Sequence, residues 1–216
     1  QGEETVLETI DFCLSDNQQV SALEMAERIT RRSEHLDQDK AKDDITCGVI
    51  YFRKPRKTLI VTGPPYDEER DREVALSFKN FDGKKVICGG TTSGIIAREL
   101  NLEIKVNLQM FRKDIPPESI MEGANLITEG TITLSKVYAD LRDDTLKDRK
   151  DTDTIRRLGE ILLDSDLIEF IVGTKINTAH HDPKLPQELE IRRNLIKNIA
   201  QLLEQKYLKK VFLQFV

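Results

Sequence analysis

Four short segments combine glycine with hydroxyl side chains at points where an apolar stretch ends. They are Thr62-Gly63-Pro64-Pro65, Gly89-Gly90-Thr91-Thr92-Ser93-Gly94, Thr128-Glu129-Gly130-Thr131 and Val172-Gly173-Thr174. Glycine lets backbone amides approach a ligand closely and adopt a positive φ, whereas threonine and serine hydroxyls donate hydrogen bonds without adding charge. Segments of this kind can bind an anion through uncharged donors.

The segment from Gly89 to Gly94 leads directly into a helical pattern that runs to Leu100. Free amides at a helix N-terminus favour an anion by about 0.3–1 kcal/mol even when they are exposed. We therefore expect a phosphate or carboxylate group to bind there. The segment is neither Gly-x-Gly-x-x-Gly nor a Walker motif, because no lysine follows its last glycine, so it predicts neither a dinucleotide nor an ATP site.

Other interpretations of these residues stay open. The glycines could simply form the tight strand-to-helix turns that every α/β domain needs. Glu129 is either a ribose or metal partner in a pocket or a solvated turn residue. A further alternative is an enzyme that acts on a phosphorylated small molecule and draws catalysis from Glu129, His180 or Asp182. Adjacent side chains such as His180 and His181 point in different directions on most backbones, so they form a poor metal pair.

After residue 57, short apolar stretches alternate with helical patterns. Strands are expected at Thr58–Thr62, Lys85–Cys88, Leu102–Val106, Asn125–Thr128, Leu167–Val172 and Val211–Phe215, and helices at Glu68–Phe81, Thr92–Leu100, Thr133–Leu141, Thr154–Leu163 and Pro186–Tyr207. This alternation predicts an α/β fold, with a mostly parallel sheet and helices on both faces. Open α/β folds bind ligands at the edge where parallel strands end, so the four segments should converge there. The charged segment Arg142–Asp153 is expected to be a solvated loop.

The first part of the chain has a different pattern. Apolar spacing predicts a helix at Glu3–Leu14 and another that begins at Ser21, where Ser21 and Glu24 have the spacing of a capping box. The β-branched and aromatic residues of Ile45–Phe52 predict a strand. The segment Arg53–Lys57 contains a proline and four cations that would end this strand. We place the domain boundary there, between residues 1–54 and 58–216.

The sequence Asp43-Asp44-Ile45-Thr46 precedes this expected strand. It resembles the closing motif of the metal-dependent protein phosphatases of the PPM superfamily, especially of the bacterial SpoIIE branch, and the order of two helices and a strand is similar too. The resemblance implies a C-terminal part of a protein serine/threonine phosphatase that acts in signalling, with residues 1–54 as an α+β remnant of the phosphatase domain. It also implies that Asp43 is a ligand of Mn²⁺ or Mg²⁺, which prefer carboxylate oxygens.

The resemblance also implies what this chain lacks. Members of the family have earlier strands that supply further metal carboxylates, and none precedes Glu3 here. We therefore expect this chain alone to be inactive as a phosphatase and to need no cofactor of its own. Its expected partners are the missing N-terminal phosphatase segment, a phosphoprotein substrate of the parent protein and a small anionic molecule. Residues 58–216 resemble domains on the C-terminal side of such phosphatases. Because those domains have no established activity, this resemblance supports the architecture of residues 58–216 and implies no mechanism.

The leading hypothesis is therefore a regulatory or ligand-sensing domain of a phosphatase, and the alternative to ligand binding is a protein-interaction module with structural glycines.

The net charge of −5 over 216 residues provides no general attraction to nucleic acid. No apolar run approaches the roughly 20 residues that span a bilayer, and no signal peptide is evident, so we expect a cytoplasmic protein without a membrane partner. The three widely spaced cysteines Cys13, Cys47 and Cys88 predict buried thiols rather than disulfides.

Overall fold

The computed structural model describes residues 2–16, 20–41, 43–106, 119–150, 153–175 and 185–216. The chain divides into two compact units, Gln1–Lys54 and Pro55–Val216. None of the helices in the described ranges has the length and the apolar composition needed to cross a bilayer.

The first unit is built on two helices, α1 (Gly2–Asp16) and α2 (Ala22–Leu36). They pack through a small buried cluster that contains Cys13, Val20, Met25 and Ile29. The predicted cap of the second helix is present, because the Ser21 hydroxyl accepts a hydrogen bond of 3.0 Å from the Glu24 amide. That contact satisfies one of the amides that the first turn leaves without a partner.

The predicted strand at Ile45–Phe52 is wrong, because this segment has no regular secondary structure. Cys47 and Val49 pack against the two-helix cluster, whereas Ile50 and Phe52 are 83% and 90% exposed. A strand needs a neighbour for its backbone hydrogen bonds, and the described part of the chain places none beside this segment. Residues 1–54 were expected to be α+β, but their described part contains helices and no strand.

The second unit contains a single sheet in the order β3-β4-β5-β2-β1-β6-β7. Its strands are β1 (Lys57–Thr62), β2 (Lys84–Cys88), β3 (Lys105–Val106), β4 (Ser119–Ile120), β5 (Leu126–Thr128), β6 (Leu167–Val172) and β7 (Lys210–Phe215). The run β5-β2-β1-β6-β7 is parallel, while β4 pairs antiparallel with both β3 and β5. The predicted mostly parallel sheet is thus confirmed, and its five parallel strands follow the 3-2-1-4-5 order of doubly wound folds.

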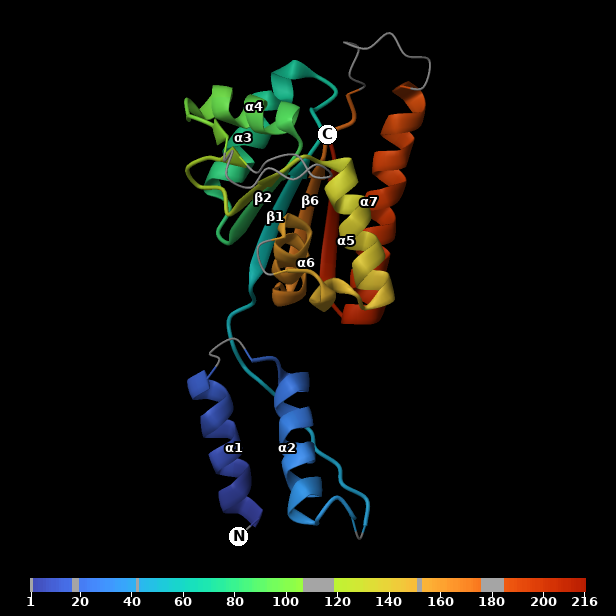
Figure 1. Ribbon diagram of the computed structural model, residues 1–216. Coiled ribbons are helices and arrows are strands. Elements are labelled where there is room, and N and C mark those ends of the chain that lie inside the picture. Colours follow the sequence, from blue (N-terminus) through green and yellow to red (C-terminus); the bar gives the residue numbers. More distant parts are fainter. Residues whose placement is uncertain (1, 17–19, 42, 107–118, 151–152, 176–184) are drawn as a thin grey trace. The chain divides into compact units, whose positions relative to one another are not determined.

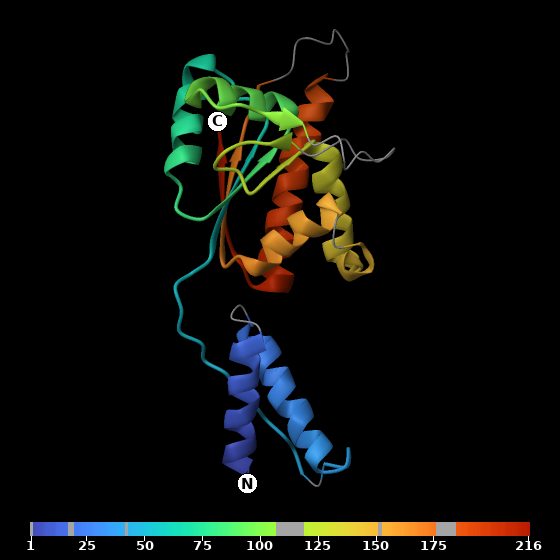
Figure 2. The same cartoon turned by 60° about the vertical axis from the view of Figure 1, so that its left-hand side comes forward.

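Helices cover both faces of this sheet, as predicted (Figures 1 and 2). The short helix η1 (Glu68–Arg70), α3 (Asp71–Asn80) and α4 (Gly90–Leu100) lie on one face. On the other face lie α5 (Thr131–Asp143), α6 (Thr154–Asp164) and α7 (Leu185–Tyr207). The result is three layers, with the sheet between two groups of helices.

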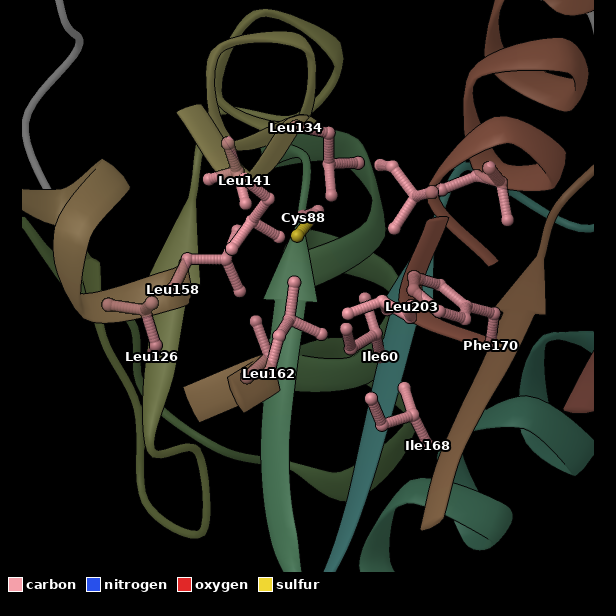
Figure 3. Packing of buried hydrophobic residues seen from close by; sticks show 14 of the residues in the cluster. Ile60, Cys88, Leu126, Leu134, Leu141, Leu158, Leu162, Ile168, Phe170 and Leu203 are labelled. Carbon is pink, nitrogen blue, oxygen red and sulfur yellow. The ribbon is translucent and has the colours of Figure 1, made fainter. Parts of the chain in front are cut away.

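The two cores follow from the alternation of side chains along each strand. Ile60, Ile168 and Phe170 point to the face of α5, α6 and α7 (Figure 3). Their neighbours in sequence, such as Leu59 and Ile171, point to the face of α3 and α4. Because parallel strands covered on both faces must be apolar on both, β1 and β6 show nearly continuous hydrophobic runs.

The predicted solvated loop at Arg142–Asp153 is wrong in part. It contains the short helix η3 (Leu146–Asp148), and the Leu146 and Asp153 side chains are buried. The Asp153 carboxylate accepts a hydrogen bond of 2.9 Å from the Ile155 amide and so caps α6. Arg149 pairs with the buried carboxylate of Asp140. Arg149 and Asp153 are thus held in place by a paired carboxylate and by a helix end.

The register of the parallel strands aligns their C-terminal ends. Thr62, the last residue of β1, pairs with Cys88 of β2 and with Val172 of β6, and Cys88 in turn pairs with Thr128 of β5. Each of these residues is the last of its strand. The segments that follow therefore start at the same level of the sheet edge.

We predict that Gly173→Ala destabilises the protein. A methyl group at this position would overlap the carbonyl oxygens of Gly63 and Pro64, which are backbone atoms and cannot rotate away. Overpacking of this kind costs about 1–3 kcal/mol, which urea unfolding followed by circular dichroism will measure.

Gly94→Ala is the matched control. Gly94 lies inside α4 with open space around its Cα, so alanine should raise the free energy of unfolding by about 0.5–1 kcal/mol through its higher helix propensity. Equal stability of the Gly173→Ala variant and the unchanged chain would contradict the close packing of the two turns.

Candidate functional site

A pocket of about 190 Å³ lies at the C-terminal edge of the sheet. It is lined by the last residues of β1 and β2, by the turns that follow β1, β2 and β5, by the starts of α4 and α5, and by α7. The lining residues are Thr62, Gly63, Pro64, Cys88, Gly89, Gly90, Thr91, Thr92, Glu129, Gly130, Thr131 and Arg192. Three of the four glycine-containing segments therefore meet at one place. The aligned ends of β1, β2 and β5 are the reason that they meet.

The N-terminus of α4 forms one side of the pocket. Gly89 precedes the helix with a φ of 129° and offers no side chain to cap it. The Ser93 amide makes the first intrahelical bond, 3.0 Å to the Gly89 carbonyl oxygen, so the amides of Gly90, Thr91 and Thr92 precede the hydrogen-bond ladder. These three amides give this end of the pocket a positive potential.

The Thr92 hydroxyl is the unusual feature of this helix start. The residue is only 2% exposed and lines the pocket, and its Oγ1 has no hydrogen-bond partner among the described residues. The Thr92 hydroxyl lies close to the turn at Gly89: a Cβ atom on Gly89 would be 3.3 Å from the Thr92 Oγ1. Buried hydroxyls are almost always hydrogen-bonded, since leaving one unsatisfied costs about 1–3 kcal/mol. An unsatisfied hydroxyl in a pocket indicates a missing partner there.

The N-terminus of α5 lies directly beside that of α4. Gly130 precedes α5 with a φ of 144°, and a Cβ atom on it would be 3.4 Å from the Cα of Gly89. Here the chain supplies its own acceptor, because Glu129 Oε2 accepts a hydrogen bond of 3.2 Å from the Ile132 amide. Two helices thus begin side by side at the pocket, and one of them is already capped by a carboxylate.

Arg192 of α7 supplies a cation that the sequence did not single out. Its guanidinium lines the pocket, and Nη1 donates a hydrogen bond of 3.4 Å to the Gly173 carbonyl oxygen. A Cβ atom at Gly63 would lie 2.5 Å from Nη1, so the positive φ and the missing side chain of Gly63 leave room for the guanidinium. In sequence, Arg192 is one of several charged residues on a long helix, and only the packing of α7 brings it to the pocket.

Four of the predicted site residues do not line the pocket. The Gly173 amide donates to the Thr62 carbonyl oxygen at 2.8 Å, and the Thr174 hydroxyl donates to the carbonyl oxygen of Val216 at 2.7 Å. Ser93 is buried and donates to the Gly90 carbonyl oxygen at 2.9 Å. Gly94 lies exposed on α4. The fourth segment therefore holds the end of β7 and the turn after β1.

Ion pairs hold the helices and turns around the pocket. Arg98 of α4 donates to the buried carboxylate of Asp71 on α3 at 2.5 Å, which ties the two helices together. The Lys175 amide donates to the Pro64 carbonyl oxygen at 3.1 Å. The ammonium group of Lys175 lies 2.7 Å from Glu68 Oε1, and this hydrogen bond lowers the pKa of Glu68.

Cys88 reaches the pocket wall as a neutral thiol. Its pKa is raised from 9.0 to about 12, mainly by burial; the Thr128 side chain acts in the opposite direction, and the negative charge of Glu129 adds to the increase. A thiolate is the form that attacks substrates and binds metals. At neutral pH the Cys88 side chain is therefore a small apolar wall of the pocket.

The predicted metal ligand Asp43 is exposed, and its Oδ1 accepts a hydrogen bond of 2.9 Å from the Asp44 amide. Among the described residues, no three His, Cys, Asp or Glu side chains come together as a metal site. The metal role of Asp43 therefore stays a prediction. The segment His180-His181-Asp182 lies outside the described residues.

Comparisons of the chain with protein-family models, with curated proteins and with solved structures found no match. The class of protein is therefore defined by fold and site alone. It is a doubly wound α/β domain with a glycine-rich pocket at the C-terminal edge of its sheet, joined to a two-helix unit.

We predict that Cys88 resists alkylation by iodoacetamide at pH 8, whereas the half-buried Cys47 reacts. Because the pKa of Cys88 is raised on folding, its proton stabilises the fold below about pH 9, and this contribution is lost as the pH rises towards 12. Mass spectrometry of peptides from the labelled protein, with and without urea, measures both sites. Labelling of Cys88 in the folded chain as fast as Cys47 would contradict the neutral, buried thiol.

Proposed function

We propose that the α/β unit binds a small anionic molecule at the pocket and acts as a regulatory, ligand-sensing part of a SpoIIE-type protein serine/threonine phosphatase. The observation that carries ligand binding is the Thr92 hydroxyl at the start of α4, which is buried and for which the described residues provide no hydrogen-bond partner. A ligand oxygen would satisfy both this hydroxyl and the neighbouring amides.

The charges around the pocket favour an anion. The start of α4 presents amide donors, and Arg192 adds a guanidinium. Glu129 is the one carboxylate among the lining residues, and one of its oxygens already accepts from the Ile132 amide. A phosphate or carboxylate group at α4 would therefore meet donors first.

The position of Gly90 supports a ligand over purely structural glycines. It lies in the first turn of α4, is exposed, and a Cβ atom there would meet nothing within 4 Å. Packing does not require glycine at this position, whereas close approach of a ligand to the helix amides does. A catalytic role has less support, because Cys88 is a neutral thiol and Glu129 is held by a backbone amide.

The phosphatase part of the proposal rests on the sequence Asp43-Asp44-Ile45-Thr46 and its resemblance to the SpoIIE branch. The two units are separate compact bodies joined through Lys54 and Pro55, which suits a sensing domain attached to another domain. Mn²⁺ or Mg²⁺ and a phosphoprotein substrate would belong to the intact phosphatase.

We predict that Thr92→Val weakens the binding of inorganic phosphate about tenfold or more, because a hydrogen bond to a charged group contributes about 1.5–3 kcal/mol. The free energy of unfolding should not fall, since the variant removes a buried hydroxyl that no described residue of the protein hydrogen-bonds. Isothermal titration calorimetry gives the affinity, and urea unfolding gives the stability.

Thr58→Val is the matched control for this variant. Thr58 is equally buried, but it lies near the start of β1 and its hydroxyl is hydrogen-bonded to Ser165 Oγ at 2.6 Å. Its loss should cost about 1 kcal/mol of stability and leave phosphate binding unchanged. If Thr92→Val binds phosphate as well as the unchanged chain, or if the chain binds no small anion, the proposed site is wrong.

We also predict that this chain shows no Mn²⁺-dependent hydrolysis of a phosphoserine peptide above that of its Asp43→Ala variant. A single carboxylate cannot hold the two metal ions that such hydrolysis uses. Phosphate release in the presence and absence of Mn²⁺ measures it. Turnover that depends on both Mn²⁺ and Asp43 would show that the chain itself carries a working metal centre.

A further inference from the structure

We infer that the ligand of this pocket is a phosphorylated polyol, whose phosphate group binds at the start of α4 and whose neighbouring hydroxyl group donates to Glu129. This inference rests on the proposed anion site and adds the chemical class of the ligand. It follows from a difference between the two helix starts that meet at the pocket: Glu129 caps α5, whereas no side chain caps α4.

Glu129 has one oxygen engaged and one available. Oε2 accepts from the Ile132 amide, whereas no group in the described part of the chain donates to Oε1. The residue lines the same pocket as Thr92 and the start of α4. An ionised carboxylate only accepts hydrogen bonds, so a ligand group that contacts it has to be a donor.

The Glu129 carboxylate also limits where the phosphate group can bind. Its contact with the Ile132 amide places a negative charge at the start of α5, so a second anion there would be repelled. The first turn of α4 has no such carboxylate, and within the described part of the chain the Thr92 hydroxyl beside it has no hydrogen-bond partner. The phosphate therefore belongs at α4, and the part of the ligand that faces Glu129 must not be anionic.

The donor to Glu129 is expected to be neutral. An ammonium group would enter a pocket that already contains the Arg192 guanidinium and the positive end of α4. A hydroxyl group donates to the carboxylate without that repulsion. The volume of about 190 Å³ is below the 300–1,000 Å³ typical of drug-sized ligands, so a phosphate with a short hydroxylated chain fits its scale.

The test compares glycerol 3-phosphate with n-propyl phosphate, which has the same carbon chain and phosphate but no hydroxyl groups. Calorimetric titrations use the full chain in EDTA, so that no divalent cation bridges Glu129 and the phosphate. We expect glycerol 3-phosphate to bind about tenfold more tightly, because a hydrogen bond to a charged group discriminates by about this factor or more.

Glu129→Gln and Glu129→Ala should reduce this preference to about twofold or less. Both variants should also bind n-propyl phosphate more tightly than the unchanged chain does, because they remove a negative charge beside the phosphate. The glutamine oxygen can still accept from the Ile132 amide, so Glu129→Gln keeps the cap of α5. Thermal unfolding confirms that each variant is folded before it is titrated.

Glu160→Gln is the charge-matched control. Glu160 is exposed on α6, pairs with Arg156 and lines no part of the pocket, so this variant should retain the preference for glycerol 3-phosphate. A lost preference in this control would mean that overall charge, rather than the Glu129 carboxylate, selects the ligand, and the inference would be wrong.

The outcomes separate this inference from the proposed function. If neither inorganic phosphate nor either ester binds the unchanged chain, the anion site itself is wrong. If n-propyl phosphate and glycerol 3-phosphate bind equally, or the Glu129 variants retain the preference, the anion site stands and the hydroxyl contact is wrong. Tighter binding of phosphoethanolamine than of glycerol 3-phosphate would overturn the neutral donor in favour of an ammonium group.

Discussion

The register of the parallel strands is the constraint on which the pocket depends. Thr62 pairs in register with Cys88, and Cys88 with Thr128, and each is the last residue of its strand, so the chain leaves β1, β2 and β5 at one level. A shift of one residue in any pair would exchange the strand's side chains between the two buried cores, each of which is packed around side chains of particular shapes. The cores that fix this register therefore also bring the glycine turns together.

Glycine at the two turns allows the helix starts to approach each other. Gly89 and Gly130 have positive φ and lie in contact, so α4 and α5 begin side by side. Their two starts differ in one respect: Glu129 caps α5, while no side chain caps α4. This asymmetry gives the pocket a donor side and an acceptor side, which is the basis for a ligand that is both anionic and hydroxylated.

The local predictions failed where pairing with distant residues decided the structure. Ile45–Phe52 has strand-forming residues, yet no described neighbour pairs with it. The antiparallel strand β4 was not predicted, because two residues carry too little periodicity to reveal a strand. Arg142–Asp153 is rich in charge, but Asp140, Arg149 and Asp153 satisfy one another in the fold. The composition of a segment shows that its charges would be costly to bury, but it does not show which oppositely charged residue compensates for that cost.

The sequence by itself determined the α/β alternation of the second unit and the three glycine segments that follow β1, β2 and β5, because apolar periodicity and turn residues act locally. It could not determine the strand order or which turns would line a pocket. Only the tertiary structure placed Arg192 at the pocket and directed the Thr174 hydroxyl to Val216. It also buried the Thr92 hydroxyl where none of the described residues forms a hydrogen bond with it. Those outcomes depend on contacts between residues far apart in the chain, which no local pattern encodes.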